Sequence, residues 1–172
     1  MKRLLLVLTL AIVTCSSCKK WQHKYPEDPE RTKDTPIKRL TGKWWILESA
    51  TLNGVDYTDS VFQLYGKYQI YFNESLYETS INGNNSYYSE IHTDIEPQFT
   101  VIWGFSKTEE NIQIIPLNGT NSNKISIVPG YLTHSNFYYF YYTILKLTST
   151  EFKISISSTN SDSTVINTFK VN

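Results

Sequence analysis

Cysteine is almost absent from this chain, and both copies, Cys15 and Cys18, lie close to the N-terminus. The sequence after Cys18 therefore has no disulfide to stabilise it, and its fold must depend on its core alone. An excess of charge of one sign is also lacking, because 16 Lys and Arg residues face 16 Asp and Glu residues. Without a basic excess, we expect no nucleic-acid partner.

Motifs of catalysis and cofactor binding are also lacking. The chain has no glycine-rich phosphate-binding loop, and its three histidines lack the spacing of zinc ligands. His134 precedes Ser135, but no Gly-x-Ser-x-Gly elbow surrounds this serine. His92, Asp94 and Glu96 alternate, so they could form a metal or acid–base cluster or simply a solvated strand face. We interpret them as a solvated face and expect no enzyme, no metal and no cofactor.

The N-terminus has the pattern of a secretory signal. A basic start precedes an apolar run at 4–13, which is too short to span a membrane, and small residues follow it. A cysteine directly after small residues resembles the end of a lipoprotein signal. We therefore predict a lipoprotein signal peptide at 1–17 and a lipid anchor on Cys18. Cys15 is the alternative anchor, and an ordinary signal without lipid is the alternative signal.

Residues 18–37 are predicted to be the acylated cysteine and a flexible tether. Three prolines interrupt this segment, its charges alternate in sign, and it has no apolar periodicity. Surface-exported lipoproteins of some Gram-negative lineages have acidic residues directly after the cysteine, whereas this chain has Lys19 and Lys20. We therefore expect an outer-membrane lipoprotein on the periplasmic side rather than on the cell surface. An envelope protein is a possible further partner, which belongs to the alternative function given below.

The remainder, 38–172, is predicted to be one all-β domain. Aromatic residues make up 15% of the chain, with 13 Tyr, and charged residues only 19%, which is typical of β-rich proteins. Alternating apolar stretches predict strands at 43–52, 68–72, 87–95, 98–105, 111–117, 124–128, 137–147, 152–156 and 165–171. Apolar residues at 58–65 have helical spacing instead. Roughly eight to ten short strands predict an up-and-down antiparallel β-barrel, with a β-sandwich as the alternative.

Two stretches of this domain resemble a known family. Leu40-Thr41-Gly42-Lys43-Trp44 and the segment 145–152 are similar to the opening and late strands of lipocalin-like domains. The closer resemblance is to the small lipocalin-like lipoproteins of Gram-negative bacteria. This resemblance implies a membrane-anchored barrel that binds a small apolar or amphipathic ligand.

The Gly-x-Trp motif is interpreted as the floor of this barrel. Gly42 lacks a Cβ and so permits a sharp bend, and the spacing from Gly42 favours Trp44 as the ring that plugs the floor. Trp45 must then point to the opposite face of the strand. Lipocalins usually carry an Arg near the last strand that packs over the Trp, and here Lys170 is predicted to take that place.

Aromatic side chains supply the candidate ligand-lining residues. In the aromatic run before residue 143, Tyr139 and Tyr141 would share one face of a strand. Together with Tyr68 and Trp103 they could line a pocket, because these rings combine an apolar body with a polar tip. Ordinary core packing is the alternative. It would favour a second function, that of a non-enzymatic structural or accessory lipoprotein of an envelope protein or glycan-handling complex, with a filled barrel.

Two short motifs could carry a modification. Asp59-Ser60-Val61 and Asp162-Ser163-Thr164 resemble the O-glycosylation signal of some bacteria. We expect both at loops, where a bulky polar glycan is tolerated. Ser60 and Ser163 are therefore candidate glycosylation sites.

Overall fold

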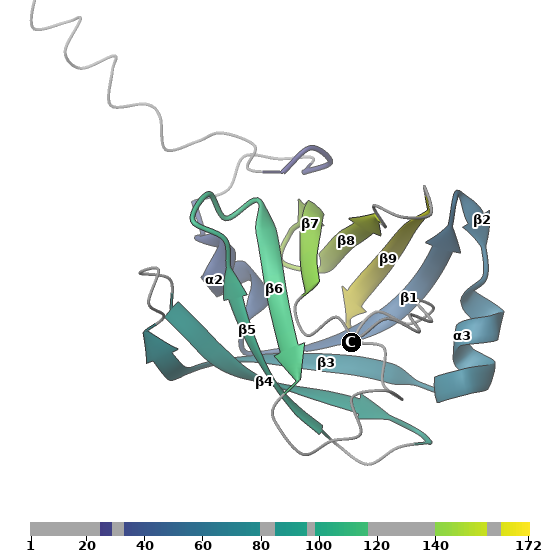
Figure 1. The fold of residues 1–172 in the computed structure, drawn as a ribbon, viewed down its shortest axis with the longest axis horizontal. Coiled ribbons are helices and arrows are strands. Elements are labelled where there is room, and N and C mark those ends of the chain that lie inside the picture. Colours follow the sequence, from purple (N-terminus) through teal and green to yellow (C-terminus); the bar gives the residue numbers. More distant parts are fainter. Residues whose placement is uncertain (1–24, 29–32, 80–84, 96–98, 117–139, 158–162) are drawn as a thin grey trace, which may run out of the picture.

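The structure is a computed structural model, and it describes residues 25–28, 33–79, 85–95, 99–116, 140–157 and 163–172 (Figure 1). The elements in these ranges are α2 (Pro36–Leu40), β1 (Trp44–Leu52), β2 (Val55–Asp56), α3 (Thr58–Tyr65), β3 (Tyr68–Thr79), β4 (Asn85–Thr93), β5 (Phe99–Phe105), β6 (Asn111–Pro116), β7 (Phe140–Leu147), β8 (Glu151–Ser157) and β9 (Thr164–Val171).

The strands form a closed up-and-down antiparallel β-barrel. The sheet order is β2-β1-β3-β4-β5-β6-β7-β8-β9, and β1 also pairs with β9. Eight strands, β1 and β3 to β9, therefore complete the circle, while the two-residue β2 adds only to the end of β1. Closure leaves these eight strands without a free edge. The predicted barrel is thus confirmed, and the β-sandwich is not the fold.

Most of the predicted elements are confirmed as well. The helix at 58–65 is α3, and each predicted strand from 87–95 onward has its counterpart, apart from 124–128, which lies outside the described residues. β3 continues past the predicted 68–72. Asn53 and Gly54 have φ angles of 51° and 80°, as a tight two-residue hairpin between β1 and β2 requires.

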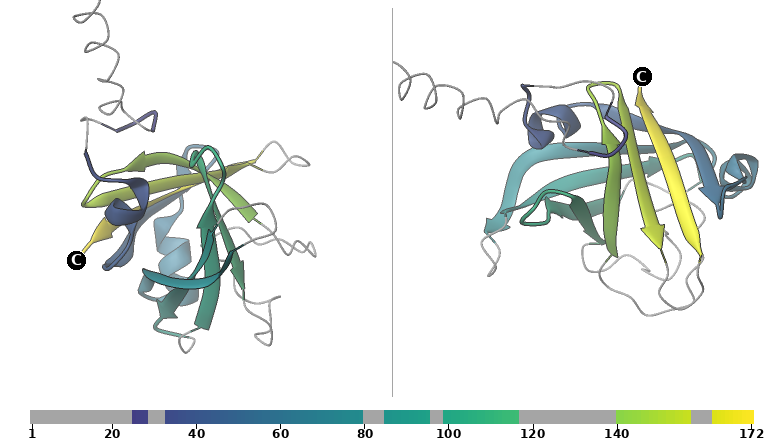
Figure 2. Two further views of the ribbon diagram at one scale, coloured as in Figure 1. Left: turned by 90° about the vertical axis from the view of Figure 1, so that its left-hand side faces the viewer. Right: turned by 90° about the horizontal axis from the view of Figure 1, so that it is seen from above.

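The two ends of the barrel carry different elements (Figure 2). We call one the α2 end; it holds the first residues of β1 and the last residues of β7 and β9, as the pairs Trp45↔Val171 and Leu147↔Phe152 show. The other is the α3 end, where β1 finishes and β9 begins, with Leu52 opposite Val165. The Gly-x-Trp motif lies at the α2 end.

Large aromatic rings fill the barrel toward its α2 end. Phe152 contacts Trp45 at 5.7 Å, Phe169 at 5.8 Å and Phe72 at 5.8 Å between ring centroids. Phe72 in turn meets Trp103 edge-on at 5.3 Å. All five side chains are buried. These contacts join β1, β3, β5, β8 and β9, so this part of the core is continuous across the barrel.

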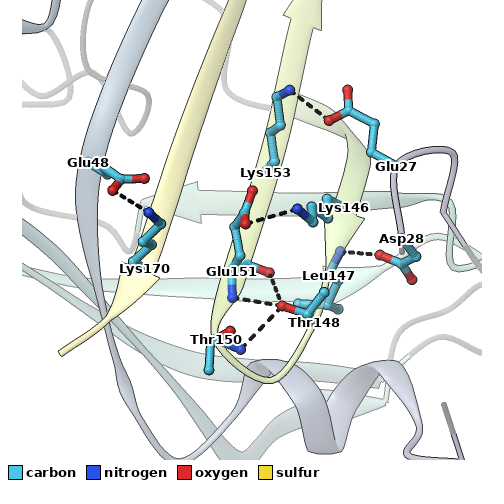
Figure 3. Close-up of polar contacts among 10 residues, drawn as sticks. All are labelled: Glu27, Asp28, Glu48, Lys146, Leu147, Thr148, Thr150, Glu151, Lys153 and Lys170. Atoms are coloured by element: carbon cyan, nitrogen blue, oxygen red, sulfur yellow. Dashed lines mark hydrogen bonds and ion pairs between the residues drawn. The ribbon is translucent and has the colours of Figure 1, made fainter. Parts of the chain in front are cut away.

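Part of the predicted tether is folded against the α2 end. The Asp28 carboxylate accepts a hydrogen bond of 2.8 Å from the backbone N–H of Leu147 (Figure 3). The same carboxylate lies 3.0 Å from Arg39 Nη1. Arg39 also donates to the Leu147 carbonyl, and its guanidinium lies over the Tyr25 ring. Both charged side chains are buried. The prediction of a flexible tether is therefore wrong for 25–28, because the hydrogen bond from Leu147 and the ion pair with Arg39 of α2 fix this segment against the barrel.

Candidate binding site in the barrel interior

The barrel floor is built on Trp45 and not on Trp44. Trp45 is fully buried, its indole Nε1 donates a 2.7 Å hydrogen bond to the Leu40 carbonyl, and Lys43 Nζ lies 5.0 Å from its ring centroid. The assignment of Trp44 as the plug is thus wrong. Gly42 does have the expected bend, with a φ of 74°. However, Gly42 precedes the strand, so its spacing from a Trp does not decide which face of the strand turns inward.

Lys170 does not pack over either tryptophan. Phe169 faces the interior, so its neighbour Lys170 must point outward, and there it forms an ion pair with Glu48 on β1 (Figure 3). The hydrogen bond to Glu48 is the main cause that raises the pKa of Lys170. The predicted pairing of Lys170 with the indole is therefore wrong, and Lys43 supplies the cation near Trp45 instead.

Trp44 belongs to an aromatic cluster on the outer face of β1, β3 and β4. Its ring lies 5.3 Å from Tyr71 and 4.5 Å from His92, measured between centroids. His92 Nε2 lies 3.6 Å from the Glu90 carboxylate on the same strand. All four side chains are partly exposed.

The candidate metal or acid–base residues do not assemble into a site. Asp94 accepts a 2.6 Å hydrogen bond from the backbone N–H of Lys67, whereas His92 packs in the outer aromatic cluster. Glu96 lies outside the described residues, as do His134 and Ser135. Within the part of the chain that the structure describes, no three His, Cys, Asp or Glu side chains are placed to hold a metal ion.

The four candidate ligand-lining residues divide into two groups. Tyr68 and Trp103 are buried in the interior, as a lining role requires. Tyr141 is 59% exposed on the outer face, so its assignment to the interior is wrong, and Tyr142 points inward in its place. Tyr139 lies outside the described residues. The sequence thus predicted correctly that neighbouring residues of β7 face opposite sides, but not which side faces the interior.

Asn167 is an interior residue that the sequence reasoning missed. It is fully buried on β9 between the inward-facing Val165 and Phe169. Within the described ranges, neither its side-chain nitrogen nor its side-chain oxygen has a hydrogen-bond partner. Its cross-strand neighbours are Ala50 on β1 and Ile154 on β8, and neither offers a polar side chain. The sequence did contain a signal, namely a polar residue at an inward position of the alternating last strand.

Besides Asn167 and the hydroxyl of Ser89, which donates to the Tyr71 carbonyl, two buried phenols contribute polar groups to the interior. Burial raises the pKa of Tyr68 and of Tyr142, and the neighbouring Tyr142 and Tyr65 raise that of Tyr68 further. Both phenols are therefore neutral at physiological pH. The buried charges of the described residues are Asp28 and Arg39, which pair with each other at the α2 end. The interior beyond the aromatic floor is thus polar at a few positions but carries no charge from these residues.

A separate groove of about 240 Å³ lies on the outside, over β5 and β6. Its wall includes Ile102, Gln113, Ile115 and the exposed Tyr141. The buried Trp103 and Phe105 also border this groove, next to the outward-facing residues of the same strand.

Of the candidate modification sites, Ser60 is exposed within α3 rather than in a loop, and Ser163 lies directly before β9. Cys15 and Cys18 lie outside the described residues. None of the helices that the structure describes is long and apolar enough to cross a membrane.

No known family model matches this chain, and no curated protein matches it either.

Proposed function

We propose that this protein is a membrane-anchored, lipocalin-like lipoprotein that binds one small apolar or amphipathic ligand inside its barrel and catalyses no reaction. The observation that carries this proposal is the closed eight-stranded barrel, whose interior buries the amide of Asn167 without a hydrogen-bond partner among the described residues. Barrels of about eight strands are either filled by side chains or hold one small ligand.

An unpaired buried amide has an energetic cost that a ligand can offset. Leaving a buried donor or acceptor without a partner costs about 1–3 kcal/mol, and buried polar groups in native proteins are almost always satisfied. A ligand group beside Asn167 would supply the missing hydrogen bonds. Tyr68 and Tyr142 bring further buried polar atoms to the interior, and the ring of Tyr68 packs against Phe169 and against Tyr65 of α3.

The proposed anchor also orients the domain. Residues 19–24 separate Cys18 from Tyr25, and a chain of this length spans at most about 25 Å. Because Tyr25 and Asp28 are packed against the α2 end, an acylated Cys18 would hold this end toward the membrane. The α3 end would then face away from the bilayer, on the periplasmic side of the outer membrane.

Metabolic labelling with a fatty-acid analogue tests the anchor. Cys18→Ala should abolish the label and leave the protein uncleaved or released from the membrane. Cys15→Ala is the matched control and should retain the label. Undiminished label in the Cys18→Ala variant would move the anchor to Cys15, and no label in the wild-type protein would refute acylation.

Native mass spectrometry tests the ligand. Protein purified in mild detergent should carry a bound small molecule or, once stripped, should bind an apolar fluorescent probe with one-to-one stoichiometry. A protein that carries nothing and binds no probe would refute the binding function.

One observation favours a second function. The continuous ring packing of Trp45, Phe72, Trp103, Phe152 and Phe169 is what a filled barrel requires. A filled barrel would suit an accessory lipoprotein that binds an envelope protein through its outer surface. Affinity purification in mild detergent would then recover a stable envelope partner, together with a ligand-free barrel.

A further inference from the structure

The outer groove over β5 and β6 combines an exposed aromatic ring with several neutral polar side chains. We infer that this groove binds one ring of a neutral saccharide, whose apolar face packs on Tyr141 and whose hydroxyl groups bond to the polar side chains of the groove. The site lies outside the barrel, so the inference does not rest on the ligand proposed for the interior.

Gly104 leaves a gap in the outer face of the sheet. It lies on β5 between the buried Trp103 and Phe105, and it pairs with Gln113 on β6. The start of β4 passes so close that a Cβ atom on Gly104 would lie 2.9 Å from the Asn85 carbonyl oxygen. A larger residue would therefore require a shift of the backbone. The groove of about 240 Å³ includes this position, where the strand has no side chain.

Tyr141 provides an aromatic ring beside this gap. It pairs with Gln113, which pairs in turn with Gly104, so the three residues form one row across β7, β6 and β5. Tyr141 lines the groove and is 59% exposed, and Ile102 and Ile115 add apolar surface. An exposed tyrosine ring is a flat apolar surface with a hydroxyl at its edge. A pyranose ring has a complementary shape, because its C–H groups gather on a face while its hydroxyl groups project from the rim.

The rest of the lining supplies both donors and acceptors of hydrogen bonds. Asn85 and Gln113 carry side-chain amides, and Ser86 and Ser106 carry hydroxyls. Each of these groups can give and accept hydrogen bonds, as a sugar hydroxyl also does. A purely apolar ligand would displace water from these groups without replacing its hydrogen bonds, which is costly. The lining therefore favours a molecule with several hydroxyl groups.

The charge and the size of the groove restrict the sugar further. Among the described residues that line it, Lys107 alone is charged, and this side chain is exposed. A single exposed cation adds little to the binding of an anion, because water and salt screen it. The groove volume of about 240 Å³ lies below the range of about 300–1,000 Å³ that is typical of drug-sized ligands. A single neutral sugar ring therefore fits the groove better than an acidic or a long saccharide.

NMR titration with defined sugars tests this inference. The full purified protein, kept in a detergent without a sugar head group, is titrated with the methyl glycosides of glucose, galactose, mannose and N-acetylglucosamine. At least one of them should bind and shift the backbone amide signals of Gly104 and Gln113. Sorbitol is the matched control ligand, because it carries similar hydroxyl groups but has no ring face. It should bind about two- to tenfold more weakly, the range for one aromatic contact.

Two variants separate the aromatic contact from the hydrogen bonds. Tyr141→Ala should weaken binding of the same glycoside by about two- to tenfold, and its melting temperature should stay close to that of wild type because the ring is exposed. Gln113→Leu should weaken binding by a similar factor through the loss of one neutral hydrogen bond. Tyr77→Ala is the matched control variant, since Tyr77 is also exposed but does not line the groove, and it should leave binding unchanged.

Three results would overturn the inference. Failure of all four glycosides to bind at millimolar concentrations would show that the groove is not a sugar site. Sorbitol binding as tight as that of the best glycoside, or glycoside binding that Tyr141→Ala does not weaken, would show that no sugar ring packs on Tyr141. None of these results bears on the proposed ligand of the barrel interior, which the apolar fluorescent probe tests separately.

Discussion

Trp44 and Trp45 are adjacent residues of the same type, so they provide an internally controlled test of which face of β1 forms the core. Replacing a large buried aromatic residue by Ala costs about 3–5 kcal/mol. Trp45 is fully buried, contacts Phe152 and donates to the Leu40 carbonyl, so we expect this full cost for Trp45→Ala. A domain of this size has about 5–15 kcal/mol of stability in total. The variant should therefore unfold at a much lower urea concentration than wild type.

Trp44→Ala is the matched comparison. Trp44 is partly exposed, and its replacement removes mainly the ring contacts with Tyr71 and His92. We therefore expect the free energy of unfolding to fall by only about 1–2 kcal/mol. Trp45→Phe keeps a ring but removes the indole donor to Leu40, and it should cost about 1–3 kcal/mol.

Urea unfolding followed by far-ultraviolet circular dichroism is the suitable assay, because these substitutions would alter tryptophan fluorescence directly. A loss for Trp44→Ala as large as that for Trp45→Ala would refute the assignment of the buried face. A Trp45→Phe protein as stable as wild type would show that the hydrogen bond to Leu40 contributes nothing.

Two further predictions concern buried ionisable groups. Arg39→Met should lower the free energy of unfolding in urea by about 3–5 kcal/mol, because it leaves the buried Asp28 carboxylate without its cation. The double variant Arg39→Met, Asp28→Asn should lose much less stability than the two single variants added together, and additive losses would contradict the pairing. Burial raises the pKa of Tyr68 and Tyr142 above 10.0, so these phenols ionise at a lower pH in the unfolded chain than in the folded protein. Their contribution to the free energy of unfolding is fully present below pH 10 and is lost as the pH rises further. Melting temperatures measured across this range should fall less steeply in Tyr142→Phe, and an unchanged slope would contradict this reasoning.

Most of the strands can be located from the amino-acid pattern alone. Alternation of apolar and polar residues is a local property, and it located β1, β4 to β9 and the start of β3. The helical spacing at 58–65 and the turn at Asn53-Gly54 are equally local, and both are as predicted. A series of short antiparallel strands without long crossovers then favours an up-and-down barrel, because closure removes the free edges.

Which face of each strand turns inward depends on how the strands pair and close into the barrel. Trp44 and Trp45, or Tyr141 and Tyr142, are related by the same alternation, and a shift of one residue exchanges their faces. The closed barrel buries Trp45, which pairs with Val171, and Tyr142, which pairs with Ile112, and leaves their neighbours on the outer face.

The tertiary structure also supplied the contacts between residues that are distant in the sequence. Asp28 reaches Leu147 across 119 positions, and this contact fixes a segment whose composition predicts disorder. The unpaired amide of Asn167 has meaning only once the barrel closes around it, because the same residue on an outward-facing position would bond to water. Local patterns specify strands, but burial and the pairing of polar groups depend on what the folded chain places beside each side chain.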